Sequence, residues 1–402
     1  MTELAVEQTA SPEPAEEVEP TGPRGWVARV TASARLAAPA IAGYALVRLL
    51  GLVVLWLWSR ADGENMWRLL GQRFDAAWYV GLAEHGYDHT IPVGPDGNLM
   101  TTNLAFFPVY PGLMRLISTV LPVSIPTAGL IITWIASPIA AWGIFMVGNH
   151  LYGRQAGTAL AILWGALPHG LVQSMGYTEV LFTAIAAWSL YALLNRNWLT
   201  AAGLCVVAGL TRPNAVALIA AIGVGALIAI LRRQDGWRPW AAAAIAPLGW
   251  LGFVGWVGLR LGRADGWLHV QGEAWGSSFD GGQYTLRTAR ALLTTETETW
   301  LVPYVVTGIL AIVAVLVVLS ILDRQPLPLL VYSMLLIVTT AGGTGYYHTN
   351  PRHMMPAFTL LLPLALAAGK MRVRNLVAIG VLLAAFSAWF GGYLALVWPY
   401  SP

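Results

Sequence analysis

One acid, Asp75, has the setting expected of a general base. It stands near the head of residues 72–87, the most polar helix-like segment of a largely apolar chain. Phe74, Trp78 and Leu82 recur every four residues and so share one helix face, expected to lie in a membrane interface, where tryptophan and tyrosine are enriched. We interpret Asp75, at the start of this helix, as a catalytic base at the membrane surface. The alternative is an ordinary N-cap of an interfacial helix.

Two arginines have the chemistry needed to hold a phosphate. Arg212 and Arg352 stand at the ends of later apolar runs, and a guanidinium binds phosphate through two parallel hydrogen bonds. A base and nearby cations suit glycosyl transfer from a lipid phosphate, because the base takes the proton of the attacking hydroxyl and the cations hold the departing phosphate. Arginines at the ends of membrane spans also snorkel for no functional reason, and that reading stays open for each.

Further polar residues are candidates for substrate binding. His348 and His353 are able to donate to a phosphate, or are plain loop histidines. Glu179 begins a predicted helix, where the helix dipole alone favours an acid. The alternative is that Glu179 contributes to a sugar-binding site. Gln271 and Trp275 carry amide and aromatic groups suited to sugars, and equally to ordinary packing.

A metal site is not expected. Glu84, His85, Asp88 and His89 cluster, but their order is not His-Glu-x-x-His, and Gly86 interrupts the helix that would present them. A divalent metal at Asp75 has no support in the sequence. No glycine-rich phosphate loop follows a strand, which argues against a soluble nucleotide-sugar donor.

The elements that must position these residues are transmembrane helices. The chain has 402 residues, 57% hydrophobic and only 11% charged, whereas soluble domains are about 25% charged. Its one cysteine excludes a disulfide framework, and its basic residues are scattered and form no stripe for nucleic acid. We therefore predict an all-α polytopic membrane protein with about eleven apolar runs, at residues 36–58, 126–149, 156–174, 179–195, 198–211, 213–231, 238–261, 301–322, 326–342, 355–369 and 375–398.

The organisation expected is one membrane domain, residues 25–402, after a disordered acidic tail, residues 1–24. The first twenty residues hold six acids and no lysine or arginine. Arg24, Arg29 and Arg35 then precede the first run, which places the N-terminus in the cytoplasm and residues 59–104 in the first outer loop. The proline-interrupted stretch 105–121 is interpreted as an interfacial or re-entrant helix.

Alternating the runs from that start places the polar motifs on one face. Strongly basic loops fall inside, as the positive-inside rule requires; they are residues 150–154, 195–197, 232–238, 323–324 and 370–374. The outer face collects Asp75 and residues 106–111, 176–179, 211–214, 263–300 and 346–353. A site there, reached from the lipid, suits a lipid-linked sugar phosphate. A transporter or flippase of lipid-linked sugars is the alternative, but it would favour repeats and charges deep within spans.

Four motifs resemble those of the PIG-V-type mannosyltransferases, in the family's order over roughly residues 44–215. They are Phe74-Asp75-Ala76-Ala77-Trp78-Tyr79 running on to Ala83-Glu84-His85-Gly86-Tyr87, then Asn103-Leu104-Ala105-Phe106-Phe107-Pro108, then Gly176-Tyr177-Thr178-Glu179, and Thr211-Arg212-Pro213-Asn214. A weaker likeness continues through Arg352 and Pro356. Phe74 departs from the family's usual tryptophan, and Ala215 from its usual glycine; neither removes an ionisable group.

The resemblance implies a GT-C glycosyltransferase fold, with Asp75 as the base of an inverting transfer from polyprenyl-phosphate mannose. It also adds motif residues Tyr177, Asn214, Trp78 and His85 to the expected substrate site. A composition rich in alanine, glycine, tryptophan and arginine, with little lysine, suggests a high-GC bacterium. The expected setting is therefore a bacterial plasma membrane with an extracytoplasmic site, and the acceptor a glycolipid, a glycan or a secreted protein.

Overall fold

A computed structural model describes residues 23–295 and 300–402, which form helices and no extended strand. The first helices are α1 (Pro23–Ala61), α2 (Met66–Gly71), α3 (Asp75–His85), α4 (Val109–Val120), α5 (Ile125–Gly165), α6 (Glu179–Leu194) and α7 (Trp198–Gly209). They are followed by α8 (Ala215–Leu231), α9 (Arg238–Ile245), α10 (Leu248–Leu261), α11 (Gly266–His269), α12 (Gln283–Thr294), α13 (Leu301–Leu322), α14 (Leu327–Ala341), α15 (Asn350–Met354), α16 (Leu362–Gly369) and α17 (Val373–Leu396). Shorter turns are η1 (Asn103–Ala105), η2 (Gly170–Ser174), η3 (Val270–Ala274), η4 (Tyr347–Thr349) and η5 (Phe358–Leu361).

Helix α1 packs closely against α5, which small residues make possible. Tyr44 of α1 stacks on Trp164 of α5 with ring centroids 5.2 Å apart. A Cβ added to Gly165 would lie 2.7 Å from the Tyr44 ring, and one added to Gly43 would lie 2.6 Å from Ile162. Close approach of this kind is typical of membrane helices, where packing rather than hydrophobic burial drives association.

Each apolar run predicted from the sequence contains all or part of a helix, but the bounds of the helices differ from those expected. The runs at 126–149 and 156–174 join as α5, which breaks at Gly153, where φ is +82°. That helix ends at Gly165, shortly before Pro168, because a proline disfavours the helical conformation of the residue before it. Five described helical stretches are long and apolar enough to cross a membrane, and five further apolar helices have 10–17 residues. A count of eleven spans therefore stays a prediction.

The chain before the first run differs from the prediction. Residues 1–22, most of the expected disordered tail, lie outside the described residues. Helix α1 already begins at Pro23, well before residue 36, so residues 23 and 24 are helical and do not belong to a disordered tail. The run at 105–121 contains the 12-residue α4, shorter than the roughly 20 residues that a crossing requires.

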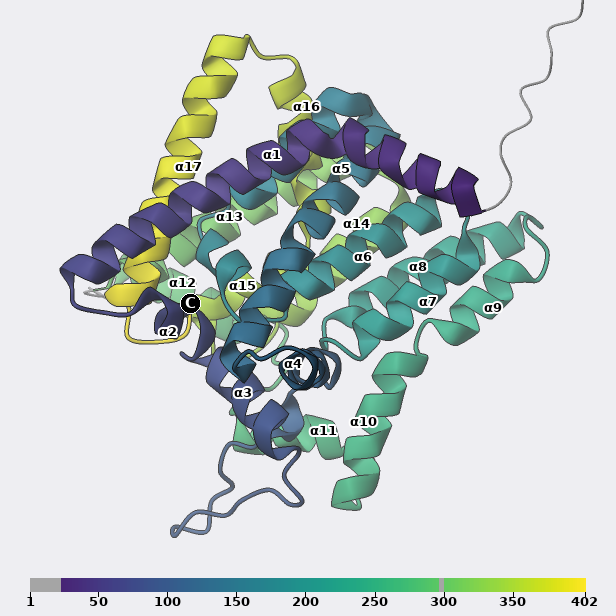
Figure 1. The fold of residues 1–402 in the computed structure, drawn as a ribbon. Helices are drawn as coiled ribbons and strands as arrows, with labels where there is room; N and C mark the ends of the chain where they lie inside the picture. Colours follow the sequence, from purple (N-terminus) through teal and green to yellow (C-terminus); the bar gives the residue numbers. More distant parts are fainter. Residues whose placement is uncertain (1–22, 296–299) are drawn as a thin grey trace, which may run out of the picture.

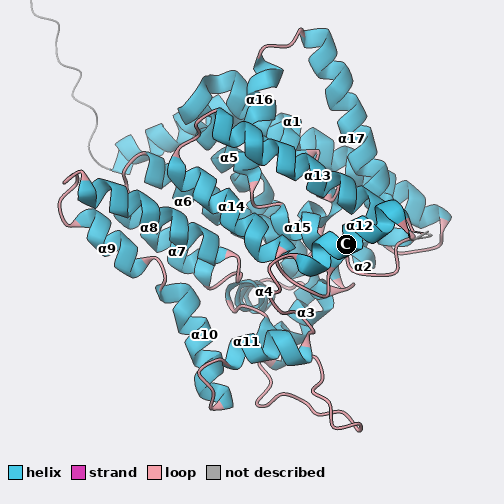
Figure 2. Ribbon diagram, turned by 180° about the vertical axis from the view of Figure 1, so that it is seen from behind, coloured by secondary structure: helices cyan, strands magenta, loops and turns pink. Residues whose placement is uncertain are grey.

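Parts of the predicted outer loops lie at one end of the helix bundle. Helices α3, α4 and α11 lie together there, and the connection between α16 and α17 lies at the opposite end (Figure 1). The same arrangement is seen from behind, where the C-terminus lies beside α2 and α15 (Figure 2). We call the first of these ends the α3 end of the bundle.

Candidate active site

The helix that carries Asp75 begins at that residue after a constrained turn. Phe74 has φ +55° and ψ −127°, a conformation that residues with a side chain rarely adopt. The guanidinium of Arg73 covers the Phe74 ring at 4.8 Å and donates a hydrogen bond of 2.6 Å to the carbonyl of Ala395. These contacts anchor the turn to α17 and fix where α3 starts. Unusual backbone held by its surroundings is common at functional sites.

The carboxylate of Asp75 is bound by the buried Arg352. Asp75 Oδ2 accepts a hydrogen bond from Arg352 Nη2 at 2.5 Å. The Asp75 side chain is 25% exposed, whereas that of Arg352 is 5% exposed. Arg352 is held in turn by Ser401, whose Oγ accepts from Nη1 at 2.7 Å, and its guanidinium lies 5.0 Å from the centre of the Tyr177 ring.

A second acid and a second arginine complete a continuous chain of charges. Glu179 Oε1 lies 3.0 Å from Arg352 Nε and 2.8 Å from Arg212 Nη1. The same Nη1 donates to Thr178 Oγ1 at 2.7 Å, and that hydroxyl also pairs with the Tyr79 hydroxyl at 3.1 Å. We call Asp75, Arg352, Glu179 and Arg212 the charged cluster.

The charged cluster is balanced and almost closed to water. Two acids face two bases, and only Asp75 is appreciably exposed, since the Glu179 and Arg212 side chains are 2% and 8% exposed. Burial lowers the pKa of Arg352, but the carboxylates of Asp75 and Glu179 outweigh it, so this pKa lies above its ordinary value. Both acids occupy the first residue of a helix, where the dipole favours negative charge. The cluster therefore has one carboxylate, that of Asp75, accessible from outside.

The two predicted histidines lie beside the charged cluster. His353 Nε2 is 3.1 Å from Arg352 Nη2, and the His353 carbonyl accepts from Asn214 Nδ2 at 3.4 Å. Burial, and then Arg352, hold the pKa of His353 well below its usual value. The His348 ring lies 5.6 Å from that of Trp398, and burial, aided by Arg352, lowers its pKa to about 4. Both imidazoles are thus neutral near pH 7.

Aromatic residues form the neighbouring wall. The Trp78 ring stacks on Phe106 at 5.8 Å and meets Trp275 edge-on at 5.1 Å. The Tyr346 hydroxyl donates to the Trp275 carbonyl at 2.8 Å, which ties the loop at residues 263–300 to the segment that carries Arg352. Residues 296–299 of that loop lie outside the described residues.

Two predicted site residues are not brought to the charged cluster. The described contact of Gln271 is through its backbone carbonyl, which accepts from the Ser277 backbone N–H just after the π-helical turn η3. His85 lies at the far end of α3, with Nδ1 3.1 Å from the Gly81 carbonyl. Ten residues separate His85 from Asp75, a rise of about 15 Å along the helix.

The predicted interfacial face of α3 is wrong. Phe74 precedes the helix, because its backbone is not helical, and Leu82 is buried in the protein. Trp78 packs on Phe106 and Trp275. The alternative of Asp75 as an N-cap is wrong too, since Phe74 occupies that position and makes no side-chain cap bond.

Asp88, in the turn that follows α3, has hydrogen-bond partners within the protein. Asp88 Oδ2 accepts from the Thr102 hydroxyl at 2.7 Å and from the Asn103 backbone at 3.1 Å. Within residues 23–295 and 300–402, no group of three histidine, cysteine or acidic residues is placed to hold a metal ion.

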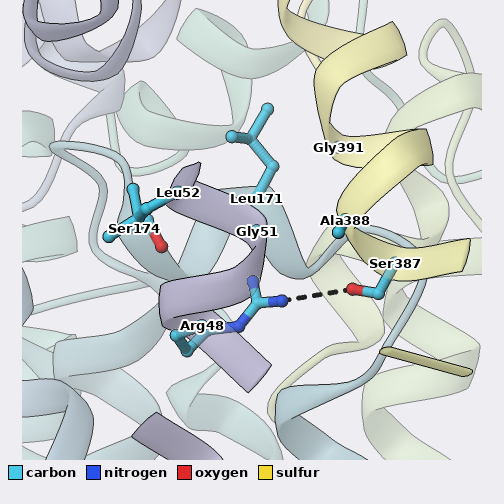
Figure 3. Close-up of a pocket in the computed structure, with 8 residues that line it drawn as sticks. All are labelled: Arg48, Gly51, Leu52, Leu171, Ser174, Ser387, Ala388 and Gly391. Atoms are coloured by element: carbon cyan, nitrogen blue, oxygen red, sulfur yellow. Dashed lines mark hydrogen bonds between the residues drawn. The ribbon is translucent and has the colours of Figure 1, made fainter. Parts of the chain in front are cut away.

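One buried charged residue was missed by the sequence analysis, namely Arg48 within α1. Its Nη1 donates to the Gly170 carbonyl and its Nη2 to Ser387 Oγ at 3.2 Å, so it joins α1 to η2 and α17 (Figure 3). The Ser387 hydroxyl donates to the Leu167 carbonyl at 2.7 Å. Arg48 thereby fixes the irregular segment that leads to Tyr177 and Glu179. An arginine inside an apolar run is itself a signal of such a role.

Comparison with known proteins finds a structure of similar fold but no protein of similar sequence. No family model matches the chain, and no curated protein matches it. Among solved structures it is similar to ArnT from Cupriavidus metallidurans bound to undecaprenyl phosphate, with a TM-score of 0.52 and 12% identity. The match covers 90% of this chain and 64% of ArnT, so the chain spans less than two thirds of that protein. Together with its apolar helices, this likeness establishes an integral membrane protein with the GT-C fold.

Proposed function

We propose that the chain is a membrane glycosyltransferase that transfers mannose from a polyprenyl-phosphate donor to a hydroxyl of a glycolipid or glycan. The observation that carries this proposal is the exposure of Asp75 alone among the members of a buried charged cluster. A solved structure of the same fold holds undecaprenyl phosphate, which supports a donor of that class. The extracytoplasmic placement rests on the positive-inside rule.

In the proposed step Asp75 acts as the general base. The acceptor oxygen attacks the anomeric carbon of the sugar while its proton passes to the Asp75 carboxylate. The bond between the anomeric carbon and the phosphate oxygen breaks, and its electron pair leaves with the polyprenyl phosphate. Attack opposite the leaving group inverts the anomeric configuration.

Arg352 has two successive tasks in this proposal. Before reaction its 2.5 Å hydrogen bond holds Asp75 in place, and Glu179 holds Arg352 from the other side. When Asp75 takes the proton, its carboxylate becomes neutral and no longer offsets the positive charge of Arg352. At the same moment the leaving phosphate gains negative charge. The released positive potential then stabilises the departing phosphate, as preorganised charges do in other transfers. Arg212 is paired with Glu179 and Thr178, so we assign it to positioning.

Mannose and membership of the PIG-V type rest on the motif resemblance around Asp75, Glu179 and Arg212. The charged cluster supports that resemblance indirectly, because three of its members come from three separate motifs and meet in space. Phe74 in place of tryptophan still packs against the core, so the departure leaves the position of Asp75 intact.

The test is transfer by detergent-purified protein from synthetic polyprenyl-phosphate mannose, with a crude lipid extract as acceptor. Mass spectrometry would follow released polyprenyl phosphate and products heavier by one hexose. We expect both with the mannose donor and neither with heat-inactivated protein. Donor movement across vesicles without any change in mass would support the transporter alternative, and no release from any polyprenyl-phosphate sugar would contradict the proposal.

A further inference from the structure

A groove of about 750 Å³ runs along α3 beyond the charged cluster. One wall is the face of α3 formed by Ala77, Trp78, Gly81, Leu82 and His85. The other wall is the turn that follows the helix, residues 86–90 with Pro92 and Asn103. The charged cluster does not line it.

The second wall is rigid although it belongs to a loop. Asn103 Nδ2 donates to the Gly86 carbonyl at 3.0 Å, and its Oδ1 accepts from the Asp88 backbone at 2.9 Å. Arg260 donates to the Asp88 carbonyl at 2.8 Å, and the Tyr87 hydroxyl donates to the Phe106 carbonyl at 2.8 Å. These bonds tie the turn to η1 and α10, so the groove is formed without a ligand and would cost little ordering on binding.

The lining suits a neutral carbohydrate. Part of the Trp78 ring lines the groove, while Phe106 and Trp275 hold the ring in place. His85 and His89 line the groove and engage only Nδ1 in the described contacts, so their Nε2 atoms have no described protein partner. The Asp88 carboxylate is occupied by Thr102 and Asn103. An aromatic surface with a few polar groups, a hydrogen-bonded carboxylate and no arginine or lysine in the lining fits a polyol better than a phosphate or a hydrocarbon chain.

The groove begins one helical turn from the proposed base. Trp78 follows Asp75 by three residues and so lies next to it on the helix surface, one turn along. His85 marks the other end of the helical wall, about 10 Å further along at 1.5 Å per residue. A ligand that covers Trp78 thus places one end beside Asp75 and extends the rest toward His85.

We propose that this groove binds the acceptor, and that the acceptor is a neutral glycan whose terminal sugar stacks on Trp78. This rests on the proposed glycosyltransferase function. Asp75 takes the proton of a hydroxyl on that terminal sugar, and the preceding residues of the glycan occupy the groove. The donor lipid phosphate then lies on the Arg352 side of Asp75.

Gly81 offers a direct test, because a Cβ at this position meets no atom within 4 Å and would extend into the groove. Gly81→Leu places a bulky side chain on the groove wall at a position where an added Cβ is in open space, and leucine is the better helix former. Gly112→Leu is the matched control, since Gly112 too is a helical glycine with no atom within 4 Å of an added Cβ, and it lies outside the groove. The assay supplies polyprenyl-phosphate mannose and an envelope extract of glycolipids and glycans, and measures mannose transferred and mannose released to water.

In Gly81→Leu we expect the ratio of transferred to hydrolysed mannose to fall by about tenfold or more, with the ratio for Gly112→Leu at the wild-type value. Periodate treatment of the extract, which destroys vicinal diols, should abolish its acceptor activity. An unchanged ratio in Gly81→Leu, or an acceptor that survives periodate, would overturn the groove assignment while the glycosyltransferase function stands. Absence of donor cleavage in the wild-type protein would overturn both.

Discussion

Ion pairs of nearly the same length occur at opposite ends of helix α6, in very different surroundings. At the α3 end Arg212 and Glu179 lie 2.8 Å apart with side chains 8% and 2% exposed. Near the ends of α6 and α8, Arg196 and Asp235 lie 2.7 Å apart with 49% and 23% exposed. Arg196 and Asp235 have φ values of +58° and +61°, as residues that end helices often do.

The surroundings decide how much each pair contributes to stability. An exposed pair gains little, because water and salt screen it, and it costs little to keep. A buried pair carries a desolvation cost that its attraction barely offsets, so it is weak evidence for stability alone. The charged cluster is therefore best explained by what Asp75 and Arg352 do together, while the pair of Arg196 and Asp235 closes two turns.

The largest effect on stability is expected from breaking the charge balance. Glu179→Gln would leave Arg212 and Arg352 buried with Asp75 as their one acidic partner, and should cost about 3 to 5 kcal/mol. Thermal unfolding in detergent would measure the loss. Adding Arg212→Gln to the same protein restores the balance and should recover part of it. A double variant no more stable than Glu179→Gln would show that charge balance is not the cause.

A smaller loss is expected where Arg48 supports the segment before Glu179. In Gly170→Ala the new Cβ would lie 2.6 Å from Arg48 Nη1 and 2.8 Å from Ser387 Oγ. Forced repacking of this kind costs about 1 to 3 kcal/mol, read out as a lower Tm. The control is Gly203→Ala in α7, where an added Cβ meets nothing within 4 Å. Equal Tm values for the two variants would contradict the supporting role of Arg48.

The lowered pKa of the buried His348 leads us to expect that acid destabilises the folded protein. Its pKa is lowered to about 4 in the folded protein, against about 6.5 when unfolded. The unfolded state therefore binds more protons between these values, so stability is complete above about pH 6.5 and falls toward pH 4. His348→Phe should reduce the drop in Tm between pH 7.5 and pH 4.5, leaving the part due to His353. A drop as large as that of the wild-type protein would argue against this origin.

The smallest effect is expected at the exposed pair. Arg196→Ala removes the hydrogen bonds to Asp235 and to Gln234, while Trp198 still donates to Asp235 at 2.7 Å. The Tm should stay within the error of the measurement, and transfer should be unchanged. A loss comparable to that of Glu179→Gln would abolish the distinction between the two ends.

The sequence predicted the membership of the charged cluster better than its geometry. Asp75 lies in the predicted first outer loop, and Glu179, Arg212 and Arg352 stand near the ends of apolar runs. Alternating the runs across the membrane is therefore sufficient to place all four at one face. Which acid pairs with which arginine was not predictable, because it depends on how α6, α7 and α15 pack. Both arginines proposed to bind phosphate are paired with acids in the structure. The GT-C fold was implied by the motifs and is confirmed.

Two features escaped the sequence because their causes are tertiary. The face of Trp78 and Leu82 resembles an interfacial stripe, but Phe106 and Trp275, which cover Trp78, come from distant segments. Arg48 looks like an interruption of an apolar run until Gly170 and Ser387 are brought beside it. Periodicity describes which residues share a face and does not say what lies opposite.

The central claim, that Asp75 is the base, is tested most directly by Asp75→Asn. The substitution keeps the shape of the side chain and removes its capacity to take a proton. The measurement is the rate of polyprenyl-phosphate release from polyprenyl-phosphate mannose with acceptor present, alongside donor binding and Tm. We predict a loss of about 10² to 10⁴ in rate with the variant still folded and still binding donor. Turnover at the wild-type rate by the asparagine variant would contradict the account.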